Sequence, residues 1–229
     1  MHAELKERGL AVGLHRVARL MSENGMKARQ RTRFKKTTDS DHGGPVATNV
    51  LEQNFKADAP DQKWGVDISY VWTAEGWLYL AVVLDLFSRK IVGWSMSDRM
   101  KRGLAMDALR RAIALRKPGE GLVHHSDRGS QYCSADYRKM VRSAGFVASM
   151  SGRGNCYDNA MVESVFKTIK SELVWRTSFA TRDQATKAIG HYIEAFYNPR
   201  RRHSSLGYSS PATYEKKYAE EKLRANALH

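Results

Sequence analysis

Cysteine, long apolar runs and acidic residues are all scarce in this sequence. Its two cysteines, Cys133 and Cys156, form no CxxC pair and have no histidine at zinc-finger spacing, which excludes a disulfide framework and a structural zinc site. The longest apolar stretch, 77–84, is far shorter than the roughly 20 residues that cross a bilayer. The amino terminus is charged and amphipathic, unlike a signal peptide. We therefore expect a cytoplasmic protein with no membrane span.

The shortage of acidic residues leaves a strong positive charge. Among 229 residues there are 38 Lys and Arg against 24 Asp and Glu, so the net charge is +14. This balance favours a polyanionic partner such as nucleic acid over an acidic small molecule. Proteins that coat RNA or membranes share it, so charge restricts the partner and leaves the chemistry open.

Residues 1–36 form a separate basic module, with ten Lys and Arg against three Glu. Two stretches with helical apolar spacing, 3–10 and 14–21, flank Gly13 and predict two short helices in a helix-turn-helix-like arrangement. A solvated basic helical hairpin would show the same pattern. Residues 37–60 have little periodicity and contain an Asp-His-Gly-Gly-Pro run, so they are predicted to be a linker.

The rest of the chain alternates strand-like and helix-like segments. Three strands joined by turns predict an antiparallel meander over 64–71, 77–84 and 90–97. Two further strands are predicted over 121–125 and 146–150, and helices over 102–116, 137–144, 159–175 and 181–197. This order predicts an α/β fold in which helices flank a five-stranded mixed sheet.

Two aspartates lie on these strands, Asp67 in the middle of one and Asp127 at the end of another. Asp67 alternates with Val66 and Ile68, so its carboxylate points away from the apolar set of its own strand. A buried acid needs a hydrogen-bond partner, an ion pair or a metal, and a structural or solvent-facing role would satisfy the pattern equally well. Asp127 ends a short strand just before Gly129, where open α/β sheets bind ligands, although a plain Asp-Gly turn would look similar.

Glu163 lies on the predicted helix 159–175. Asn159, Lys167 and Lys170 share its face, and an ordinary Glu163–Lys167 surface pair is the alternative to a functional role. Taken with the two aspartates, however, Glu163 completes a set of carboxylates of the kind that hard divalent cations prefer. Transfer of a phosphodiester uses two Mg²⁺ ions about 3.5–4 Å apart, one for the attacking oxygen and one for the leaving oxygen.

The spacing of these acids matches a known pattern. Thirty-five residues separate Asp127 from Glu163, and Lys170 follows seven residues later. This resembles the DD(35)E signature, with its trailing basic residue, of retroviral integrases and their bacterial transposase relatives. The chain from Lys63 to about Tyr214 is similar to the OrfB-type catalytic subunit of insertion-sequence transposases, through the motifs WGVDISY (64–70), DLFSRKIVGW (85–94), HHSDRGSQY (124–132), SGRGNCYDNA (151–160) and YNPRRRHSSLGY (197–208).

The resemblance implies a ribonuclease-H-like core over 61–218, followed by a tail over 219–229. Asp67, Asp127 and Glu163 would be the catalytic residues and the ligands of two Mg²⁺ or Mn²⁺ ions. The activity would be cleavage at element ends and transfer of a 3′-hydroxyl into target DNA. A homo-oligomer on DNA and a nucleoid-associated location in a bacterial cytoplasm are also implied.

DNA contacts follow from the same resemblance. They fall on the catalytic helix, at Lys170 and also at Asn159 and Lys167, where basic side chains reach phosphate or sugar. A basic cluster suited to backbone contacts follows, and its alternative is a solvated loop; it comprises Arg200, Arg201, Arg202 and His203. Residues 152–157 are similar to the flexible active-site loop of the family.

Other conspicuous residues are expected to be structural. His124 and His125 are neighbours on a strand and point to opposite faces, so they are not expected to share a metal ion. The five tryptophans are predicted to serve in core or strand-face packing rather than as base-stacking platforms; they are Trp64, Trp72, Trp77, Trp94 and Trp175.

Family members carry a longer helical segment ahead of the position of Met1. A truncated recognition module is therefore expected, with a frameshift-fused or separate helix-turn-helix subunit as a partner. Three functions compete: an active transposase, a recognition-deficient remnant that binds DNA or interferes with a full-length enzyme, and a ribonuclease-H-type nuclease. The flanking motifs and the basic carboxyl region disfavour the nuclease.

Overall fold

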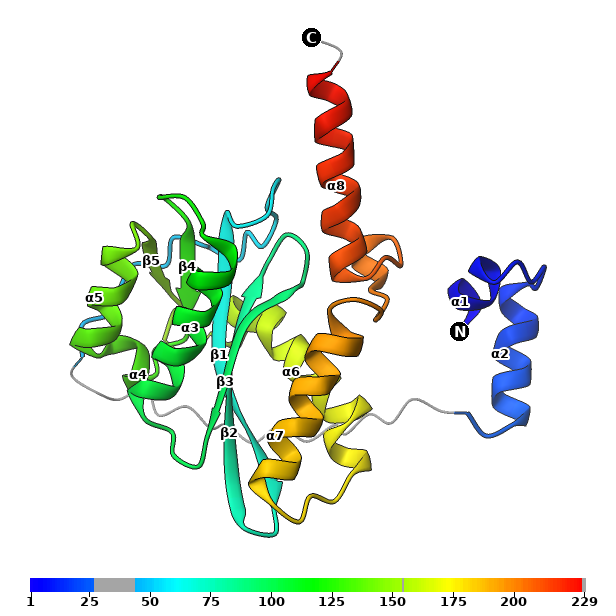
Figure 1. Cartoon of the computed structure of the whole chain (residues 1–229), viewed down its shortest axis with the longest axis horizontal. Helices are drawn as coiled ribbons and strands as arrows, with labels where there is room; N and C mark the ends of the chain where they lie inside the picture. The colour runs from blue at the N-terminus through cyan, green and yellow to red at the C-terminus, as the bar shows by residue number, and fades with distance from the viewer. Residues whose placement is uncertain (27–43, 154, 228–229) are drawn as a thin grey trace. The chain divides into compact units, whose positions relative to one another are not determined.

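The computed structural model describes residues 1–26, 44–153 and 155–227, and the chain divides into two units, Met1–Phe34 and Lys35–His229. The first unit contains α1 (His2–Glu7) and α2 (Leu14–Glu23), and Val17 of α2 is buried (Figure 1). α1 ends earlier than predicted because Gly9, at φ +77°, takes the left-handed conformation that stops a helix. Two short helices are present as predicted.

Five strands form one mixed sheet in the order β3-β2-β1-β4-β5 (Figure 1). β1 to β3 are antiparallel neighbours, whereas β4 runs parallel to β1 and β5 parallel to β4. The fold and its antiparallel meander are therefore as predicted. The bounds of the strands are β1 (Lys63–Thr73), β2 (Gly76–Asp85), β3 (Ile91–Ser97), β4 (Val123–Ser126) and β5 (Val147–Met150).

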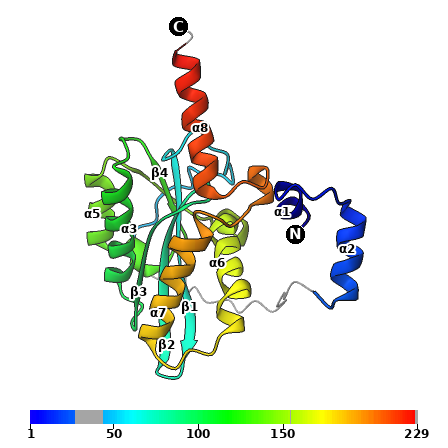
Figure 2. The same cartoon turned by 45° about the vertical axis from the view of Figure 1, so that its right-hand side comes forward.

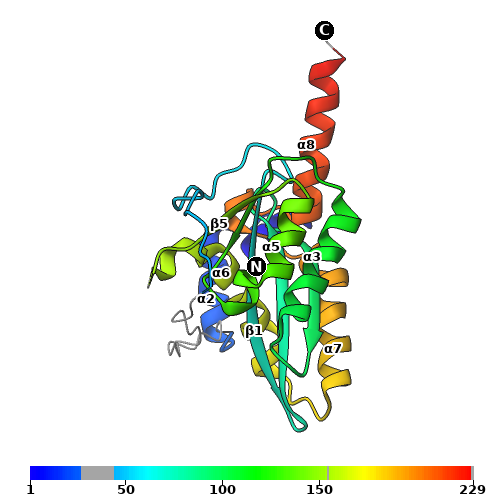
Figure 3. The same cartoon turned by 90° about the vertical axis from the view of Figure 1, so that its left-hand side faces the viewer.

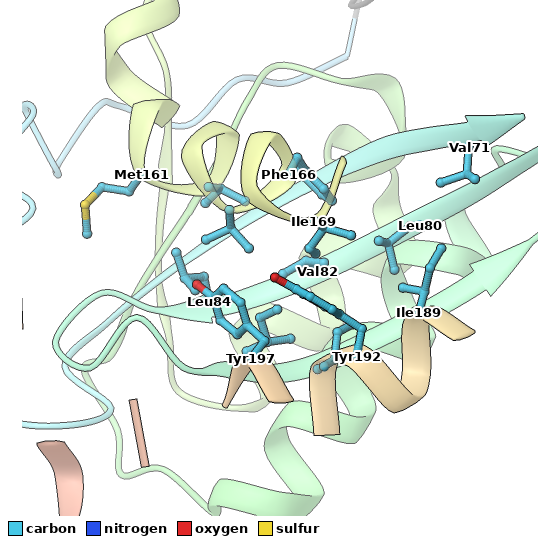
Figure 4. Close-up of a cluster of buried hydrophobic side chains, with 14 of the residues drawn as sticks. Val71, Leu80, Val82, Leu84, Met161, Phe166, Ile169, Ile189, Tyr192 and Tyr197 are labelled. Carbon is cyan, nitrogen blue, oxygen red and sulfur yellow. The ribbon is translucent and has the colours of Figure 1, made fainter. Parts of the chain in front are cut away.

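Helices cover both faces of this sheet (Figures 2 and 3). One face packs on α3 (Arg102–Arg116), α4 (Ser130–Cys133) and α5 (Ala135–Ser143), and the other on α6 (Ala160–Glu172) and α7 (Arg182–His191). Each face has its own apolar cluster, and Figure 4 shows the one under α6 and α7. β2 contributes to both clusters, which explains its continuous apolar sequence.

Close packing between α3 and β3 depends on Gly93. A Cβ at this position would meet the carbonyl oxygen of Ala108 and lie 2.7 Å from the Cβ of Ala112. The glycine therefore lets the helix approach the strand backbone.

The carboxyl half departs from the prediction in its details. The helix predicted over 181–197 is α7 followed by a π-helical segment, η3 (Tyr192–Tyr197), which places Tyr192, Ile193 and Tyr197 in the core. Short 3₁₀ turns lie between the helices of this half, at η1 (Cys156–Asn159), η2 (Val174–Arg176) and η4 (Ser204–Leu206). No helix in the described ranges is long and apolar enough to cross a bilayer.

The segment predicted as a linker is part of the core unit where the structure describes it. Leu51 is buried in the apolar cluster beneath α6, and the N–H groups of Val50 and Leu51 donate to Ser149 Oγ at 3.0 and 3.1 Å. Residues 37–43 of the predicted linker lie outside the described residues. The absence of periodicity over 44–60 reflects an extended segment that packs on β5, and an extended segment of this kind has no helical pattern to detect.

Helix α8 (Pro211–Asn226) crosses the predicted boundary between core and tail at 218. Its first turns are tied to the core, because Glu215 accepts from Arg116 of α3 at 2.9 and 3.0 Å and pairs with Lys90 at 2.9 Å. Beyond this anchor the helix extends away from the sheet (Figure 1). An exposed helix presents no apolar stripe, so its sequence resembles a polar tail.

Candidate active site

Two carboxylates lie where the parallel strands β1 and β4 stop pairing. Gly65 of β1 is opposite His125 of β4 in the last pair of this ladder. Asp67 and Asp127 each lie two residues beyond that pair, so they are at the same level on neighbouring strands of the sheet. The Gly129 N–H donates to Asp127 Oδ1 at 2.9 Å and shapes the turn after β4. The middle of β1 and the end of β4 thus present two acids at the same level, where the parallel pairing of the two strands ends and where such sheets bind ligands.

Close packing of α6 on β1 brings the third acid to this edge. A Cβ at Gly65 would lie only 2.7 Å from Val162 Cγ2, so glycine is required for the approach. Asn159, just ahead of α6, donates its side-chain N–H to the Val66 carbonyl at 3.3 Å. Glu163 lies in the first turn of α6 and is therefore held close to the two aspartates.

The three carboxylates perturb one another. Burial raises the pKa of Asp67 well above its ordinary value, and the charges of Asp127 and Glu163 raise it further. The Ile68 N–H, 2.7 Å from Asp67 Oδ1, and the charge of Lys170 lower it in part. Burial and then the charge of Asp127 also raise the pKa of Glu163. A bound cation would relieve this repulsion.

A set of three carboxylates fits the chemistry of Mg²⁺ or Mn²⁺, which prefer oxygen ligands. Over the part of the chain that the structure describes, no three His, Cys, Asp or Glu side chains are grouped closely enough to hold a metal ion. The structure thus brings the three predicted residues to one edge of the sheet, but their carboxylates are not close enough together to coordinate one ion.

Lys170 and Lys167 differ in their surroundings. Lys170 Nζ lies 4.7 Å from the centre of the Tyr70 ring, and burial lowers its pKa while the charge of Asp67 raises it. Lys167 is exposed, as expected for a side chain available to DNA. Asn159 is instead 6% exposed and committed to the Val66 carbonyl. This hydrogen bond helps to position α6, and the DNA contact at Asn159 stays a prediction.

Asp158 is the residue of the site that the sequence analysis missed. It is 1% exposed, and its two carboxylate oxygens accept from four groups in two segments. Within the loop, the donors are the Gly152 N–H at 2.7 Å and the Asn155 side chain at 2.8 Å. Asn49 and Gln53, more than a hundred residues earlier, each donate at 3.0 Å. Asp158 therefore ties the loop before α6 to the segment that precedes the sheet. The sequence signal was a polar run without periodicity, which does not identify a buried acid.

Tyr132 is a second neighbour that sequence reasoning did not single out. Burial raises its pKa well above the ordinary value, and the charges of Asp67 and Asp127 add to this effect. Its ring packs edge-on against Tyr137, with the centres 5.2 Å apart. Tyr132 is therefore a buried aromatic neighbour of the two aspartates.

The basic cluster over 200–203 separates into two kinds of residue. Arg201 forms a two-pronged ion pair with Glu172, at 2.7–3.0 Å, and is largely buried. Burial, followed by the charge of Arg201, lowers the pKa of His203 to about 4. These two side chains were predicted to contact DNA, but they face the protein because Glu172 of α6 supplies the anionic partner. Arg200 is exposed, and Arg202 is half-buried with Nη1 donating to the Tyr208 carbonyl at 3.1 Å.

His124 and His125 are structural, as predicted. His124 Nε2 is 3.0 Å from the Tyr137 hydroxyl, whereas the His125 ring lies between Ser149 and Ser151 at 2.9 and 3.2 Å. Their different partners reflect the opposite directions of neighbouring side chains on β4. Burial lowers the pKa of both rings to about 4, so both are neutral at physiological pH.

Comparison with known proteins places this site in a family. Residues 57–156 and 144–211 each match an integrase core domain, and residues 1–34 match an HTH-like domain. The chain is 47% identical over 218 residues to the insertion element IS600 uncharacterized 31 kDa protein of Shigella sonnei, covering 95% of this chain and 80% of that protein. It is 45% identical over 214 residues to transposase InsF for insertion sequence IS3A of Escherichia coli (strain K12), covering 93% and 74% respectively.

Solved structures show the same fold at low sequence identity. The HTLV-2 integrase catalytic core domain, solved in complex with magnesium, gives a TM-score of 0.55 at 16% identity, covering 70% of this chain and 99% of that chain. A chain of the simian T-cell lymphotropic virus intasome, solved with PP2A regulatory subunit B56 gamma, gives a TM-score of 0.52 at 17% identity, covering 69% and 56%. The matched domains, the identity to InsF and the shared fold agree, and the chain belongs to the IS3-family transposases, enzymes of DNA transposition with an integrase core and an amino-terminal HTH-like region.

Proposed function

We propose that this transposase cuts DNA at the ends of its element and joins the 3′ ends to target DNA, with Asp67, Asp127 and Glu163 as its catalytic residues. The observation that carries this proposal is the strand register. Both aspartates lie two residues beyond the Gly65–His125 pair, and α6 brings Glu163 to the same edge. Mutually perturbed carboxylates in such a position are typical of catalytic sites.

Two divalent ions, Mg²⁺ or Mn²⁺, are part of this proposal, with the same three residues as ligands. The donor set supports it, as does the magnesium in the HTLV-2 integrase core structure. When bound, such ions activate the attacking water or 3′-hydroxyl and stabilise the leaving oxygen.

The chain's own residues would position the reacting strand. Lys170, beside Asp67, would contact a phosphate next to the site, and exposed Lys167 would contact the same strand three residues earlier on α6. Arg200 and Arg202 remain proposed backbone contacts from the carboxyl region. Asp158 fixes the loop that leads into α6. In this way it would keep Glu163, in the first turn of α6, in position beside β1.

DNA of the element ends and of the target is the proposed partner, on the bacterial nucleoid. A homo-oligomer that pairs two ends is also proposed, because one copy presents one set of three carboxylates. The likeness to a chain of a retroviral intasome supports assembly on DNA.

The test is an assay of nicking and joining. Purified protein is incubated with Mg²⁺ and a labelled duplex that bears the element's end, in parallel with Glu163→Gln. Glu220→Gln, an exposed change on α8, is the matched control for loss of one carboxylate. We expect the wild type and the control to nick and join, and Glu163→Gln to bind DNA without either reaction.

Other results would point to the competing functions. Binding without cutting by the wild type would indicate a recognition-deficient remnant. Cutting without joining would indicate a nuclease. Full activity of Glu163→Gln would contradict the proposed site.

A further inference from the structure

Three aromatic rings form an exposed ladder on the β1–β2 hairpin. Trp72 and Trp77 are paired across the two strands, with ring centres 4.7 Å apart, and Tyr70 packs edge-on against Trp77 at 5.0 Å. Trp72 is 59% exposed and Trp77 is 44% exposed. The other tryptophans, Trp64, Trp94 and Trp175, are buried or half-buried. Packing within the sheet therefore does not account for this pair.

The ladder is linked to the proposed active site through the open edge of β1. Trp72 lies five residues after Asp67, about 17 Å along the strand at roughly 3.3 Å per residue, and the alternation of side chains directs the two to opposite faces of β1. Lys170 lies between them, with Nζ over the Tyr70 ring at 4.7 Å and its charge acting on Asp67. β1 has lost its pairing with β4 beyond Gly65, so this edge of the strand is open alongside the carboxylates.

A second cation lies beside the backbone of the hairpin. The Arg182 side chain donates to the Trp77 carbonyl at 3.1 Å, and a Cβ on Gly76 would lie 3.1 Å from its guanidinium. Exposed aromatic rings set among lysine and arginine are the chemistry by which proteins hold unpaired nucleotides, since every base has a face that can stack. A second copy of this chain could also cover two tryptophans, but it would carry the same net charge of +14, which opposes its association.

We propose, building on the proposed catalytic role of Asp67, that Trp72 and Trp77 are a stacking platform for unpaired bases of the DNA strand that enters the active site. At about 3.4 Å per base step, the 17 Å separation corresponds to about five nucleotides from the reacting phosphate. Lys170 would contact the phosphates that lie between the stacked bases and the reacting phosphate. Every base can stack on an aromatic ring, so the platform binds unpaired DNA whatever its base sequence.

The experiment compares two DNA probes that bind the full chain. One is a blunt duplex, and the other is the same duplex with an unpaired oligothymidine tail that carries 2-aminopurine, whose fluorescence is quenched by stacking. The variants are Trp72→Ala/Trp77→Ala, the conservative Trp72→Phe/Trp77→Phe, and Tyr208→Ala as a control that removes an exposed ring elsewhere. Light scattering measures the oligomeric state of each variant, and thermal unfolding verifies that each is folded.

We expect the double alanine variant to lose at least about fivefold in affinity for the tailed probe and to lose the quenching, with blunt-duplex affinity unchanged. The phenylalanine variant and Tyr208→Ala should retain both. Equal affinity for the tailed probe, an equal loss on both probes, or a change of oligomeric state would overturn the proposal, the last in favour of a second copy as occupant. These are binding measurements, so they are independent of the nicking assay, which alone reports on Asp67, Asp127 and Glu163.

Discussion

Replacement of Asp158 by alanine would remove one buried carboxylate that serves four donors. The Gly152 N–H belongs to the backbone of the loop, so it has no freedom to turn toward water. The Asn155, Asn49 and Gln53 side chains are only part-buried and can find water after a small rotation. The bond from Gly152 therefore sets the lower limit of the loss.

A hydrogen bond to a charged group contributes about 1.5–3 kcal/mol. One such bond predicts that Asp158→Ala reduces the free energy of unfolding by at least about 1.5 kcal/mol. Asparagine is not expected to rescue it, because its N–H₂ group would face two of the donors. Gln53→Ala removes a single bond from the surface side and should cost about 1 kcal/mol.

Urea unfolding of the wild type, the two single variants and the double variant measures the cost of each substitution alone and in the background of the other. If Gln53 acts through Asp158, the Gln53→Ala change should cost nothing further in the Asp158→Ala background. The nicking rate should also fall in Asp158→Ala, because the loop it holds leads directly into the helix of Glu163. A loss below about 1 kcal/mol for Asp158→Ala, or strict additivity with Gln53→Ala, would refute this account of the loop.

Three further predictions concern packing and charge. Gly93→Ala should lower the free energy of unfolding by at least about 1–3 kcal/mol through its clash with α3, whereas Gly103→Ala, which meets nothing within 4 Å, should leave a thermal melt unchanged or raise it. Glu215→Gln should cost about 2–4 kcal/mol in urea unfolding, since it leaves Arg116 and Lys90 with less compensation; a loss under 1 kcal/mol would show that Asp61 suffices for Arg116. Burial and the charges of Arg201 and Arg89, opposed by Glu172, hold the pKa of His203 at about 4, against about 6.5 in an unfolded chain. The unfolded state therefore takes up the proton first, and stability should fall as pH decreases from 6.5 to 4, with His203 contributing at most about 1.4 kcal/mol per pH unit; an unchanged slope in His203→Gln would contradict this.

Local patterns in the sequence were enough to predict the sheet and most helices. The alternation in β1, the continuous apolar run of β2 and the helical period over 102–116 depend on neighbouring residues alone, and the structure places these elements within a few residues of the predicted ends. The spacing of Asp127 and Glu163 with its flanking motifs likewise identified the family. These patterns involve residues that are close in the sequence, so they can be detected without the three-dimensional structure.

Burial and pairing across long distances were beyond the sequence. Arg201 was assigned to DNA because its neighbours are basic, but its partner Glu172 lies 29 positions away on another helix. Asn159 bonds a backbone carbonyl 93 positions earlier, and the segment around Leu51 bonds a serine 98 positions later. A polar side chain has the same letter whether it faces water or a buried partner, so composition does not distinguish these cases.

The residue types, their periodicity and the order of the acids were therefore determined by the sequence: a basic chain, a mixed sheet and three carboxylates. The tertiary structure alone decided which cations remain available to DNA, that Asp158 ties the loop to the segment before the sheet, and that Trp72 and Trp77 stay exposed. The reason is physical, since exposure and charge compensation are set by contacts among segments that folding brings together, and those contacts leave no local trace in the chain.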